Sequence, residues 1–411
     1  MKKTLKIRLP KLTEWQSDAF HKIKCGMNTG RNFVIKSPRQ VGKTYFLKYV
    51  LTYYALKFAG SKSVIIEPVG YAARRIQREM FKSLKKTRLL ESNNMTDGLM
   101  IFKNGSELHF HSAEQGDSLR GLTVSGILIL DEAAFITDDV YDICLPFCNV
   151  WRAPKLIVSS PLFKQGFFFN EFSDEDNTVF DWNRDDYDFS RFLSEEDYKR
   201  YLKKYTKAKF TTEVLGDFIE AWSEVFGNFK ACVCTPDDMA PVYGGLDWST
   251  GSDNDETVLT LMNKDRQVVY RWATADTDPV AQVNIIASII NSFPMLKGVY
   301  VEENSIGKVY LSMLRKAVRN QAVIHSHDTT NEQKREIVED LIVAFEQRNI
   351  GIDNDPMLHA QLAGFQIKKL KKGYTYGNDK DSTHDDRVDS LAFCYYMFKP
   401  AQTGTVGFSK R

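Results

Sequence analysis

Short, uninterrupted runs of apolar residues recur along the first part of the chain and alternate with segments of helical periodicity. The runs occupy residues 32–35, 63–66, 127–130 and 155–158. Runs of this kind predict strands buried on both faces, as in a parallel sheet. Residues 45–51 and 71–84 predict helices, and residues 101–110 place Asn104-Gly105 between two apolar stretches, which is typical of a β-hairpin. The first part of the chain therefore predicts an α/β domain with a parallel sheet core.

The pattern changes after about Gln165 and changes again near Pro236. Residues 166–236 mix aromatic residues with acidic clusters and predict only short helices, so we interpret them as a small lid or linker subdomain. Beyond them, further strands are predicted at residues 241–247, 257–262, 267–271 and 297–304, and helices at 280–293, 306–318, 332–347 and from Thr383 onward. The early strands suit an antiparallel start to a mixed sheet. We predict three parts: residues 1–165, 166–236 and 237–411.

Composition changes this picture little. The 411 residues include 43% hydrophobic and 26% charged residues with a formal net charge of +2, as in ordinary soluble proteins. The six cysteines show no paired Cys-x-x-Cys spacing, so we expect reduced thiols rather than a zinc site. No apolar run is long enough to cross a bilayer and no signal-peptide pattern follows Met1, so we expect a soluble protein without a membrane partner.

The segment between the first strand and the following helix has the pattern of a phosphate-binding loop. Its residues are Ser37, Pro38, Arg39, Gln40, Val41, Gly42, Lys43 and Thr44. Backbone N–H groups at the helix start would face phosphate oxygens, Lys43 would add a positive charge, and Thr44 would offer a hydroxyl to Mg²⁺. Ser37 stands where such loops usually begin with glycine. Upstream, Gln16 is a candidate for adenine contact, because its amide can both donate and accept a hydrogen bond.

Two further strand ends carry candidate ATPase residues. Asp131 and Glu132 follow the apolar run at residues 127–130, at the edge of a parallel sheet where ligands bind. Asp131 would hold Mg²⁺, and Glu132 would orient and activate the attacking water. Ser159 and Ser160 follow the run at residues 155–158 and are candidates for sensing the γ-phosphate.

The last part of the chain presents acids at the ends of several elements. Asp247 and Glu302 follow predicted strands, and Asp385 and Asp386 begin the last predicted helix. Acids placed this way predict a two-metal hydrolytic site, with Mg²⁺ or Mn²⁺ because the candidate ligand atoms are oxygens. Some choices stay open, between Glu302 and Glu303, which face opposite ways in a strand, and between Asp385 and Asp386, with a slight preference for Asp386. Asp389, one helical turn further on, and His384 are additional candidates.

The order of these motifs resembles that of the large terminase subunit of tailed bacteriophages, the motor and nuclease that packages viral DNA. The resemblance runs from about Leu12 to Phe398. The missing first glycine, with Arg39-Gln40 inside the loop, is typical of that family. The fold it implies is an N-terminal P-loop ATPase followed by a ribonuclease H-like nuclease.

The resemblance also implies roles for individual residues. Gln16 would contact adenine, Lys43 and Thr44 would bind the phosphates and Mg²⁺, Asp131 would support the metal, and Glu132 would be the catalytic carboxylate. Arg39 would stabilise the transition state in cis. Arg120 lies where some members place a trans-acting arginine finger, although pairing with an acid of its own subunit is an alternative. Ser159 and Ser160 match the coupling motif. The nuclease metal ligands would be Asp247, Glu302 and either Asp385 or Asp386.

The cofactors and partners follow from the same resemblance. They are ATP, Mg²⁺ (with Mn²⁺ possible at the nuclease site), double-stranded DNA, a portal protein and procapsid, a small terminase subunit, and further copies of the chain in a ring, expected to be a pentamer on the portal. The protein would act in the cytoplasm of the infected bacterial host and would be absent from the finished virion.

Two other classes of function fit some of these motifs. A helicase-like DNA repair or restriction ATPase with a fused nuclease would share the phosphate loop and the acids. A binding or scaffolding ATPase would share the phosphate loop, and its C-terminal acids would be structural only.

Overall fold

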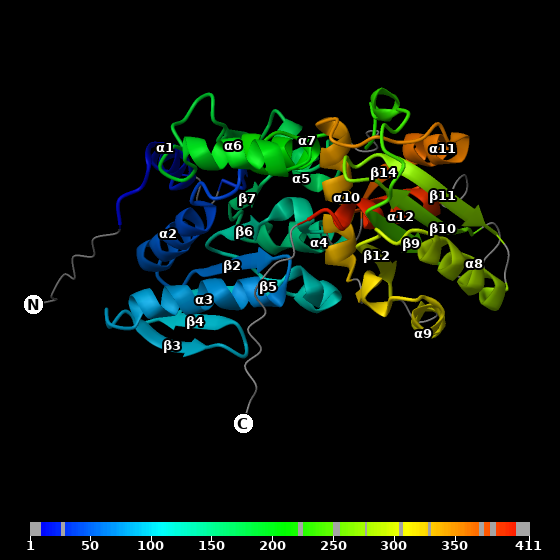
Figure 1. Cartoon of the computed structure of the whole chain (residues 1–411). Helices are drawn as coiled ribbons and strands as arrows, with labels where there is room; N and C mark the ends of the chain where they lie inside the picture. The colour runs from blue at the N-terminus through cyan, green and yellow to red at the C-terminus, as the bar shows by residue number, and fades with distance from the viewer. Residues whose placement is uncertain are drawn as a thin grey trace, which may run out of the picture. The chain divides into compact units, whose positions relative to one another are not determined.

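The chain divides into two compact units, each of which is described by itself (Figure 1). The computed structural model describes residues 10–25, 29–220, 225–249, 255–275, 278–303, 307–327, 330–369, 374–378 and 384–399. Unit 1 contains residues 1–202, 208–221 and 369–373, and unit 2 contains residues 203–207, 222–368 and 374–411. The division into residues 1–165, 166–236 and 237–411 stays a prediction.

Unit 1 is built on a sheet whose order is β3-β4-β5-β2-β6-β7-β1-β8. The strands are β1 (Asn32–Lys36), β2 (Lys62–Glu67), β3 (Leu90–Asn94), β4 (Leu99–Phe102), β5 (Glu107–Ser112), β6 (Leu128–Asp131), β7 (Lys155–Ser159) and β8 (Thr178–Asp181). From β5 to β8 the neighbours pair in parallel, and β3 and β4 add an antiparallel edge. The predicted parallel core and the predicted hairpin at Asn104-Gly105 are thus confirmed.

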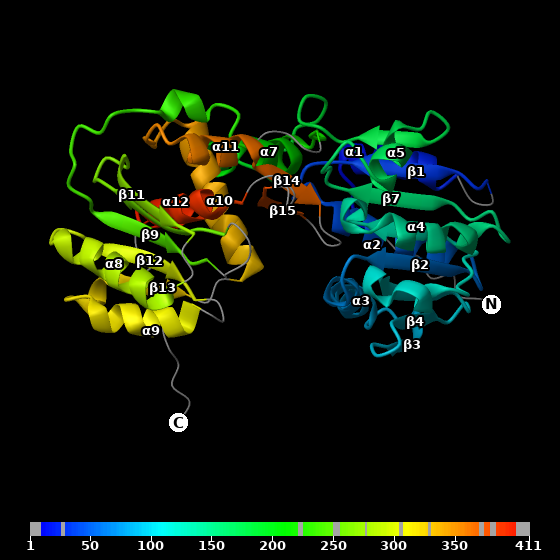
Figure 2. The same cartoon turned by 90° about the vertical axis from the view of Figure 1, so that its right-hand side faces the viewer.

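Helices cover both faces of this sheet, as Figure 2 shows. They are α1 (Glu14–Ile23), α2 (Lys43–Lys57), α3 (Gly70–Leu84), α4 (Asp138–Cys144) and α5 (Phe167–Ser173). Alternate side chains of each strand point to opposite faces: Phe33 and Ile35 of β1 join one core with residues of α1, α2 and α3, whereas Val34 joins another with residues of α4 and α5. Burial on both faces explains why these strands are continuously apolar.

The parallel strands bring their carboxyl ends to one edge of the sheet. Ser37 follows β1, Glu67 ends β2, Asp131 ends β6 and Ser159 ends β7. Strand β8 lies in the stretch that the sequence assigned to a lid, and it pairs with β1 at the end of the sheet. The next helices are α6 (Glu195–Lys204) and α7 (Lys207–Phe210).

Unit 2 contains the mixed sheet that the sequence predicted, in the order β11-β10-β9-β12-β13. Its strands are β9 (Tyr243–Asp247), β10 (Thr257–Met262), β11 (Val268–Thr274), β12 (Gly298–Glu302) and β13 (Ile324–His327). Strands β9, β10 and β11 are antiparallel, and β12 runs parallel to both β9 and β13. A separate ribbon joins β14 (Gln366–Lys369) and β15 (Tyr374–Gly377).

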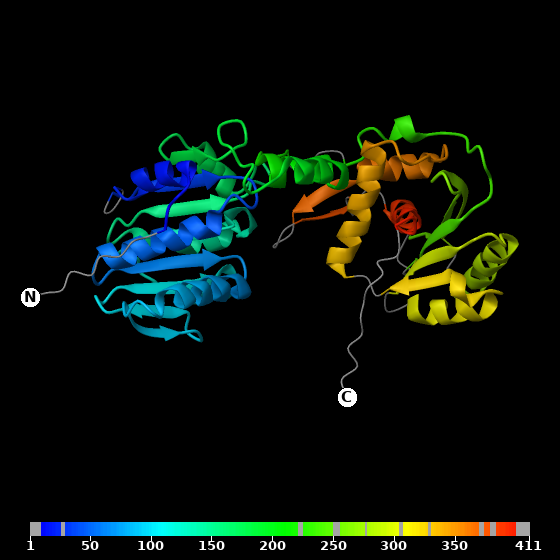
Figure 3. The same cartoon turned by 60° about the vertical axis from the view of Figure 1, so that its left-hand side comes forward.

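Figure 3 shows α10 and α12 on one side of this sheet and α8 and α9 on the other. The helices are α8 (Pro279–Ser292), α9 (Gly307–Ala317), α10 (Asn331–Glu346), α11 (Pro356–Gly364) and α12 (Asp386–Tyr396). Helix α12 packs tightly on β9, because a Cβ at Gly245 would lie 2.2 Å from the carbonyl oxygen of Ser390. Only glycine permits this approach, which carries the acids of α12 to the strand that ends in Asp247.

No helix within the described residues has the length and apolar character that a membrane crossing requires.

Candidate nucleotide and metal sites

The loop between β1 and α2 has a backbone suited to holding phosphate. Gln40 and Gly42 have positive φ angles of 63° and 88°, and Lys43 is the first residue of α2. A Cβ at position 42 would lie 2.8 Å from Nε2 of Gln16, a side-chain end that can shift, so it is the positive φ angle that favours glycine here. The first N–H groups of a helix have no partner within it, and here they lie at the sheet edge where an anion would bind.

Lys43 joins three of the predicted ATPase segments. Its Nζ donates a hydrogen bond to Oγ of Ser160 over 2.6 Å and to the carbonyl of Pro38 over 3.3 Å, and it lies 3.8 Å from Oε1 of Glu132. Lys43 is only 6% exposed. The structure therefore brings the phosphate-loop lysine, the acid after β6 and the serine after β7 together, and their roles in ATP hydrolysis stay predictions.

Ser159 links the same three segments through hydrogen bonds to the backbone. Its hydroxyl accepts from the N–H of Ala134 over 3.1 Å and donates to the carbonyl of Ser160 over 2.7 Å. Its own carbonyl accepts from the N–H of Ser37 over 3.2 Å. These bonds connect the backbone of the phosphate loop to the residues after β6 and β7, and the coupling role of Ser159 stays a prediction.

Glu132 is held in a conformation that few residues adopt. Its φ and ψ angles are 48° and 45°, in the left-handed region, directly after β6 and before a short 3₁₀ helix, Ala133–Phe135. This backbone costs energy for a residue with a Cβ and is typical of functional sites. The turn places the carboxylate of Glu132 near Lys43, while Asp131 remains buried at the end of the strand.

Asp131 is paired with a second buried acid, Glu67, which the sequence analysis did not single out. Ile66 of β2 pairs with Leu130 of β6, so Glu67 and Asp131 are the next positions along neighbouring strands. Burial, reinforced by the charge of Asp131, raises the pKa of Glu67 to about 10. Burial, reinforced by the charge of Glu132, raises the pKa of Asp131 to about 7. The upward shifts of the pKa of Glu67 and of Asp131 favour a proton shared by the two carboxyl groups, held chiefly by Glu67, whose pKa is raised more.

Gln16 is buried beside the phosphate loop with both ends of its amide engaged. Oε1 accepts from the N–H of Thr13 over 3.1 Å, as part of a capping box at the start of α1, and Nε2 donates to the carbonyl of Gly42 over 3.2 Å. The neighbouring Trp15 donates from Nε1 to the carbonyl of Val41 over 3.4 Å. In this conformation α1 supports the phosphate loop, and adenine contact by Gln16 stays a prediction.

The two candidate arginines are exposed and paired with acids of their own chain. Arg39 donates from Nη1 to Oε1 of Glu213 over 3.0 Å, and its backbone N–H donates to the carbonyl of the same residue over 2.9 Å. Arg120 donates from Nε to Oδ1 of Asp117 over 2.8 Å. The self-pairing alternative for Arg120 is the arrangement in this structure, and its trans role stays a prediction.

In unit 2, the acids at the ends of β9 and β12 lie side by side. Val301 pairs with Leu246 in parallel, so Glu302 and Asp247 are the next positions of the two strands. Burial raises the pKa of Asp247 well above its usual range, and the charges of Asp389, Asp386 and Glu302 raise it further. Of the two glutamates considered, Glu302 lies beside Asp247 and adds to this shift, and the choice of metal ligand stays a prediction.

Helix α12 contributes acids to two neighbouring places. Asp389 receives the ammonium of Lys334, with Nζ 2.5 Å from Oδ2, and burial raises the pKa of Asp389 to about 6 although Lys334 opposes the shift. Asp386 offers a carboxylate oxygen within 4.8 Å of ligand atoms of Asp255 and His384. Asp385 is the N-cap residue of α12, whereas the cap candidate Thr383 lies outside the described residues.

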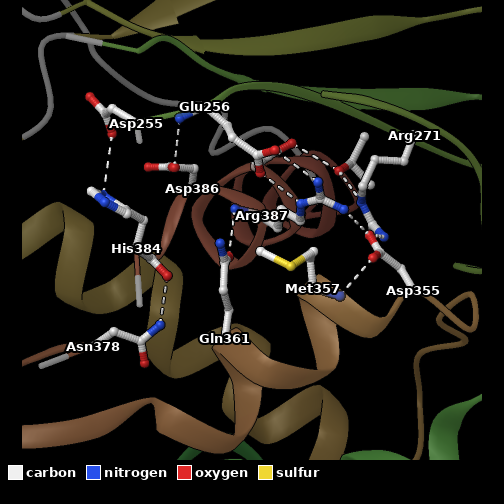
Figure 4. A network of polar contacts seen from close by, with 12 residues as sticks. Asp255, Glu256, Arg271, Asp355, Met357, Gln361, Asn378, His384, Asp386 and Arg387 are labelled. Atoms are coloured by element: carbon white, nitrogen blue, oxygen red, sulfur yellow. Dashed lines mark hydrogen bonds and ion pairs between the residues drawn. The ribbon is translucent and has the colours of Figure 1, made fainter. Parts of the chain in front are cut away.

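A network of ion pairs fixes the start of α12 against β10 (Figure 4). Arg387 donates to both carboxylate oxygens of Glu256, over 2.8 and 2.9 Å, and to Oδ2 of Asp355 over 2.6 Å. The backbone N–H of Glu256 donates to Oδ2 of Asp386 over 2.9 Å. Burial nevertheless raises the pKa of Asp386 to about 8. Arg387 therefore fixes the side chain of Glu256, and the backbone of Glu256 in turn fixes the carboxylate of Asp386.

The donor atoms of this centre fit a hard divalent cation. Asp386 and Asp255 offer carboxylate oxygens and His384 one imidazole nitrogen, a set that Mg²⁺ tolerates and Mn²⁺ accepts more readily. The raised pKa of Asp386 fits this reading, because a carboxyl group that is costly to ionise alone gains most from a bound cation.

Two family models match this chain, one to each half. The model described as "Terminase large subunit, T4likevirus-type, N-terminal" matches residues 34–231, and the one described as "Terminase RNaseH-like domain" matches residues 244–398. The chain belongs to the large terminase subunit family. The predicted family and fold class are thereby confirmed, and members of this family are DNA-packaging ATPases with a nuclease domain.

Solved terminase structures share the fold of this large terminase. The large terminase of a thermophilic bacteriophage has a TM-score of 0.60 at 13% identity, over 95% of this chain and 99% of that chain. The same phage protein in complex with ADP has a TM-score of 0.57 at 14% identity, over 94% and 99% of the two chains. In complex with ATP-gamma-S it has a TM-score of 0.56 at 14% identity, over 93% and 98%. No curated protein matches the sequence of this chain.

Four residues in or beside the two sites of this terminase were not among those predicted from the sequence: Glu67, Asp255, Lys334 and Arg387. Glu67 comes at the end of a predicted strand, just before a proline. Lys334 falls at an ordinary polar position of the helix predicted at residues 332–347. Neither residue belongs to a recognisable motif. Asp255 was detectable in principle, because it lies just before the strand predicted at residues 257–262.

Proposed function

We propose that this large terminase hydrolyses ATP at the Lys43–Glu132 site to drive double-stranded DNA into a procapsid, and that the acids of unit 2 cut the DNA at initiation and termination. The observation that carries the proposal is the convergence of Lys43, Ser160 and Glu132 at one sheet edge. The same chain carries the acid cluster of Asp247, Glu302, Asp386 and Asp389.

At the first site, the residues have separable tasks. The N–H groups at the start of α2 and the ammonium of Lys43 would bind the β- and γ-phosphates, which would draw Lys43 away from Ser160. Glu132 would accept the proton of the attacking water or orient it. Thr44 and Asp131 would hold Mg²⁺, which neutralises the phosphate charge. Arg39 would leave Glu213 to stabilise the transition state in cis, and Arg120 would act on a neighbouring subunit.

At the second site, we propose a nuclease that uses two divalent ions. Asp247, Glu302 and Asp386 are the proposed ligands, with Asp385 as an alternative to Asp386, and Asp255 and His384 lie close enough to contribute. Two bound ions would supply an activated water and stabilise the leaving oxygen of the phosphodiester. Arg387 would hold the side chains of Asp386 and Glu256 in position while DNA binds.

The outer face of α3 is our proposed contact for the DNA backbone in unit 1. Arg74, Arg75, Arg78 and Lys82 are exposed on α3, and Lys85, Lys86 and Arg88 are exposed just after it. Taken one cluster at a time, such residues are usually a solvated face. Together on one helix they suit phosphate contacts, so binding should weaken steeply with salt and depend little on sequence.

In this proposal the working form is an assembly. Further copies of the chain would form a ring, expected to be a pentamer, on a portal protein of the procapsid, and a small terminase subunit would deliver the DNA in the host cytoplasm. Family membership supports these partners, and the exposed position of Arg120 would leave it accessible to a neighbouring copy of the chain.

The test is ATP-dependent protection of DNA from DNase in a reaction with purified procapsids and the full chain. We expect protected DNA of capsid length only when ATP and procapsids are both present. Unwinding of a short duplex without procapsids would instead indicate a helicase, and absence of both activities would contradict the motor assignment.

A further inference from the structure

A lysine side chain lies within the acid cluster of unit 2. Nζ of Lys334, on α10, is 2.5 Å from Oδ2 of Asp389, on α12, and the side chain of Asp389 is only 5% exposed. The neighbouring Ser390 donates from Oγ to the carbonyl of Gly245 over 3.0 Å, two residues before Asp247. Lys334 therefore reaches the place where α12 meets the end of β9.

The charge of Lys334 acts on three acids of this centre. Asp389 raises the pKa of Lys334 most, and Asp247 and Glu302 raise it further, so the ammonium stays protonated although partial desolvation opposes this. In return, Lys334 opposes the rise that burial imposes on the pKa of Asp247. A positive charge in contact with buried carboxylates is what a bound divalent cation would provide.

The two sides of the acid cluster in unit 2 differ in the positive charge that is already present. Asp386 accepts a hydrogen bond from the backbone N–H of Glu256, and its carboxylate lies within 4.8 Å of ligand atoms of Asp255 and His384, a group that could hold a cation. On the side of Asp247 and Asp389, the ammonium of Lys334 already fills the equivalent electrostatic role. The two sides should therefore differ in their affinity for divalent ions.

We propose that Lys334 is a resident cation of the nuclease centre. It compensates Asp389 and Asp247 in the metal-free protein and has to leave Asp389 before a divalent ion binds on that side. The proposal rests on the proposed nuclease function and makes Lys334 a positioning residue that sets how many ions bind and how tightly. Removing its charge should strengthen ion binding, because two like charges within a few ångströms repel strongly at low dielectric.

The experiment is a Mn²⁺ titration of the full chain, with free Mn²⁺ measured by electron paramagnetic resonance. We expect the wild type to show one tighter and one weaker class of site in unit 2. Lys334→Met should tighten the weaker class by about tenfold or more, whereas Lys334→Arg should bind as the wild type does. Equal affinities in wild type and Lys334→Met would overturn the inference.

A matched control is available beside the same helix pair. The side chain of Lys399 is 39% exposed, as is that of Lys334, and it pairs with Glu336 and Asp340 of α10. Lys399→Met should therefore leave Mn²⁺ binding unchanged. If it tightens binding as much as Lys334→Met does, the effect is one of net charge and the inference fails.

Thermal melting supplies a second readout that does not depend on DNA cleavage. In EDTA, Lys334→Met should melt lower than Lys399→Met, and Mn²⁺ should raise its melting temperature more than that of the wild type. If Lys334→Met does not fold, Lys334→Gln is measured in the same way, and an equal Mn²⁺ response would count against the inference. Failure of both wild type and Lys334 variants to bind Mn²⁺ would reject the nuclease function itself.

Discussion

Nζ of Lys43 and Oγ of Ser160 lie 2.6 Å apart, so the phosphate-loop lysine is hydrogen-bonded to the serine that follows β7. A bound γ-phosphate would compete for the same ammonium, and the free hydroxyl of Ser160 would then change partners. The adjacent Ser159 is tied to the backbone of Ala134 and Ser37. We predict that this exchange at Lys43 would link nucleotide state to the segments after β6 and β7.

Ser160→Ala tests this route. Lys43 would keep Pro38 and Glu132 as partners, so we expect nucleotide affinity to change by no more than about threefold. DNA-stimulated turnover and packaging should fall by about fivefold or more, since the coupling contact is lost. The control is Ser83→Ala, since the exposed hydroxyl of Ser83 donates to the carbonyl of Glu79 within α3. A large loss of nucleotide affinity with coupling intact would contradict the proposed route.

Glu132→Gln should separate binding of ATP from its hydrolysis. The amide keeps the size of the side chain but cannot accept a proton, so turnover should fall by about 10² to 10⁴-fold. ATP binding, measured by equilibrium titration with a fluorescent analogue, should remain. Glu196→Gln on the exposed face of α6 is the control. Hydrolysis close to that of the wild type would remove Glu132 from the role of base.

Asp247→Asn should stop DNA cleavage and spare the ATPase. Loss of a ligand carboxylate removes several kcal/mol of charge stabilisation, so plasmid nicking with Mn²⁺ should fall by at least about 10²-fold. The predicted ATPase residues lie in unit 1, so the rate of ATP hydrolysis should be unchanged. Asp265→Asn, an exposed pair with Lys264, serves as the control. Continued nicking by Asp247→Asn would defeat the metal-ligand assignment.

Arg120→Ala and Arg39→Ala should respond differently to assembly. Arg120 and Asp117 are both exposed in one chain, so the arginine is accessible to a neighbouring subunit. Arg120→Ala should reduce hydrolysis by about 10³-fold in the assembled state, with little effect in dilute monomer. Because Arg39 lies inside the phosphate loop, Arg39→Ala should lower the rate of ATP hydrolysis in both the monomer and the assembled state. The measurement is the ATPase rate of each variant as a function of protein concentration, with and without the portal protein. An equal loss of rate for Arg120→Ala in the monomer and in the assembled state would argue against trans action.

The sequence predicts the framework of both units well because buried parallel strands leave an unmistakable pattern. The runs at residues 32–35 and 127–130 are apolar on both faces, and they became β1 and β6. By contrast, β3 is polar and exposed at the sheet edge, and β8 lies in a stretch rich in acids and aromatic residues. Nothing in their local sequence distinguishes such edge strands from loops.

The site residues, like the strands, divide into those with a clear sequence pattern and those without one. Lys43, Glu132 and Ser160 could be predicted because each follows a recognisable strand, and strand ends of a parallel sheet meet at one edge. Lys334 could not be predicted, because its partner Asp389 is 55 residues away on another helix. The pairing of Glu67 with Asp131 depends on the strand order β2-β6, which the sequence does not specify.

Glu67 offers a test of that pairing through pH. Its pKa rises from the ordinary 4.5 to about 10 in the folded protein, chiefly through burial. Between these values the folded protein binds more protons than the unfolded chain, so this group makes the free energy of unfolding fall as pH rises, by at most about 1.4 kcal/mol per pH unit. The amide of the Glu67→Gln variant cannot titrate. In EDTA, the free energy of unfolding of Glu67→Gln minus that of the wild type should therefore increase from pH 5 to pH 9, by urea denaturation. The exposed Glu196→Gln should give a flat difference over the same range, and a flat difference for Glu67→Gln would show that Glu67 is ionised beside Asp131.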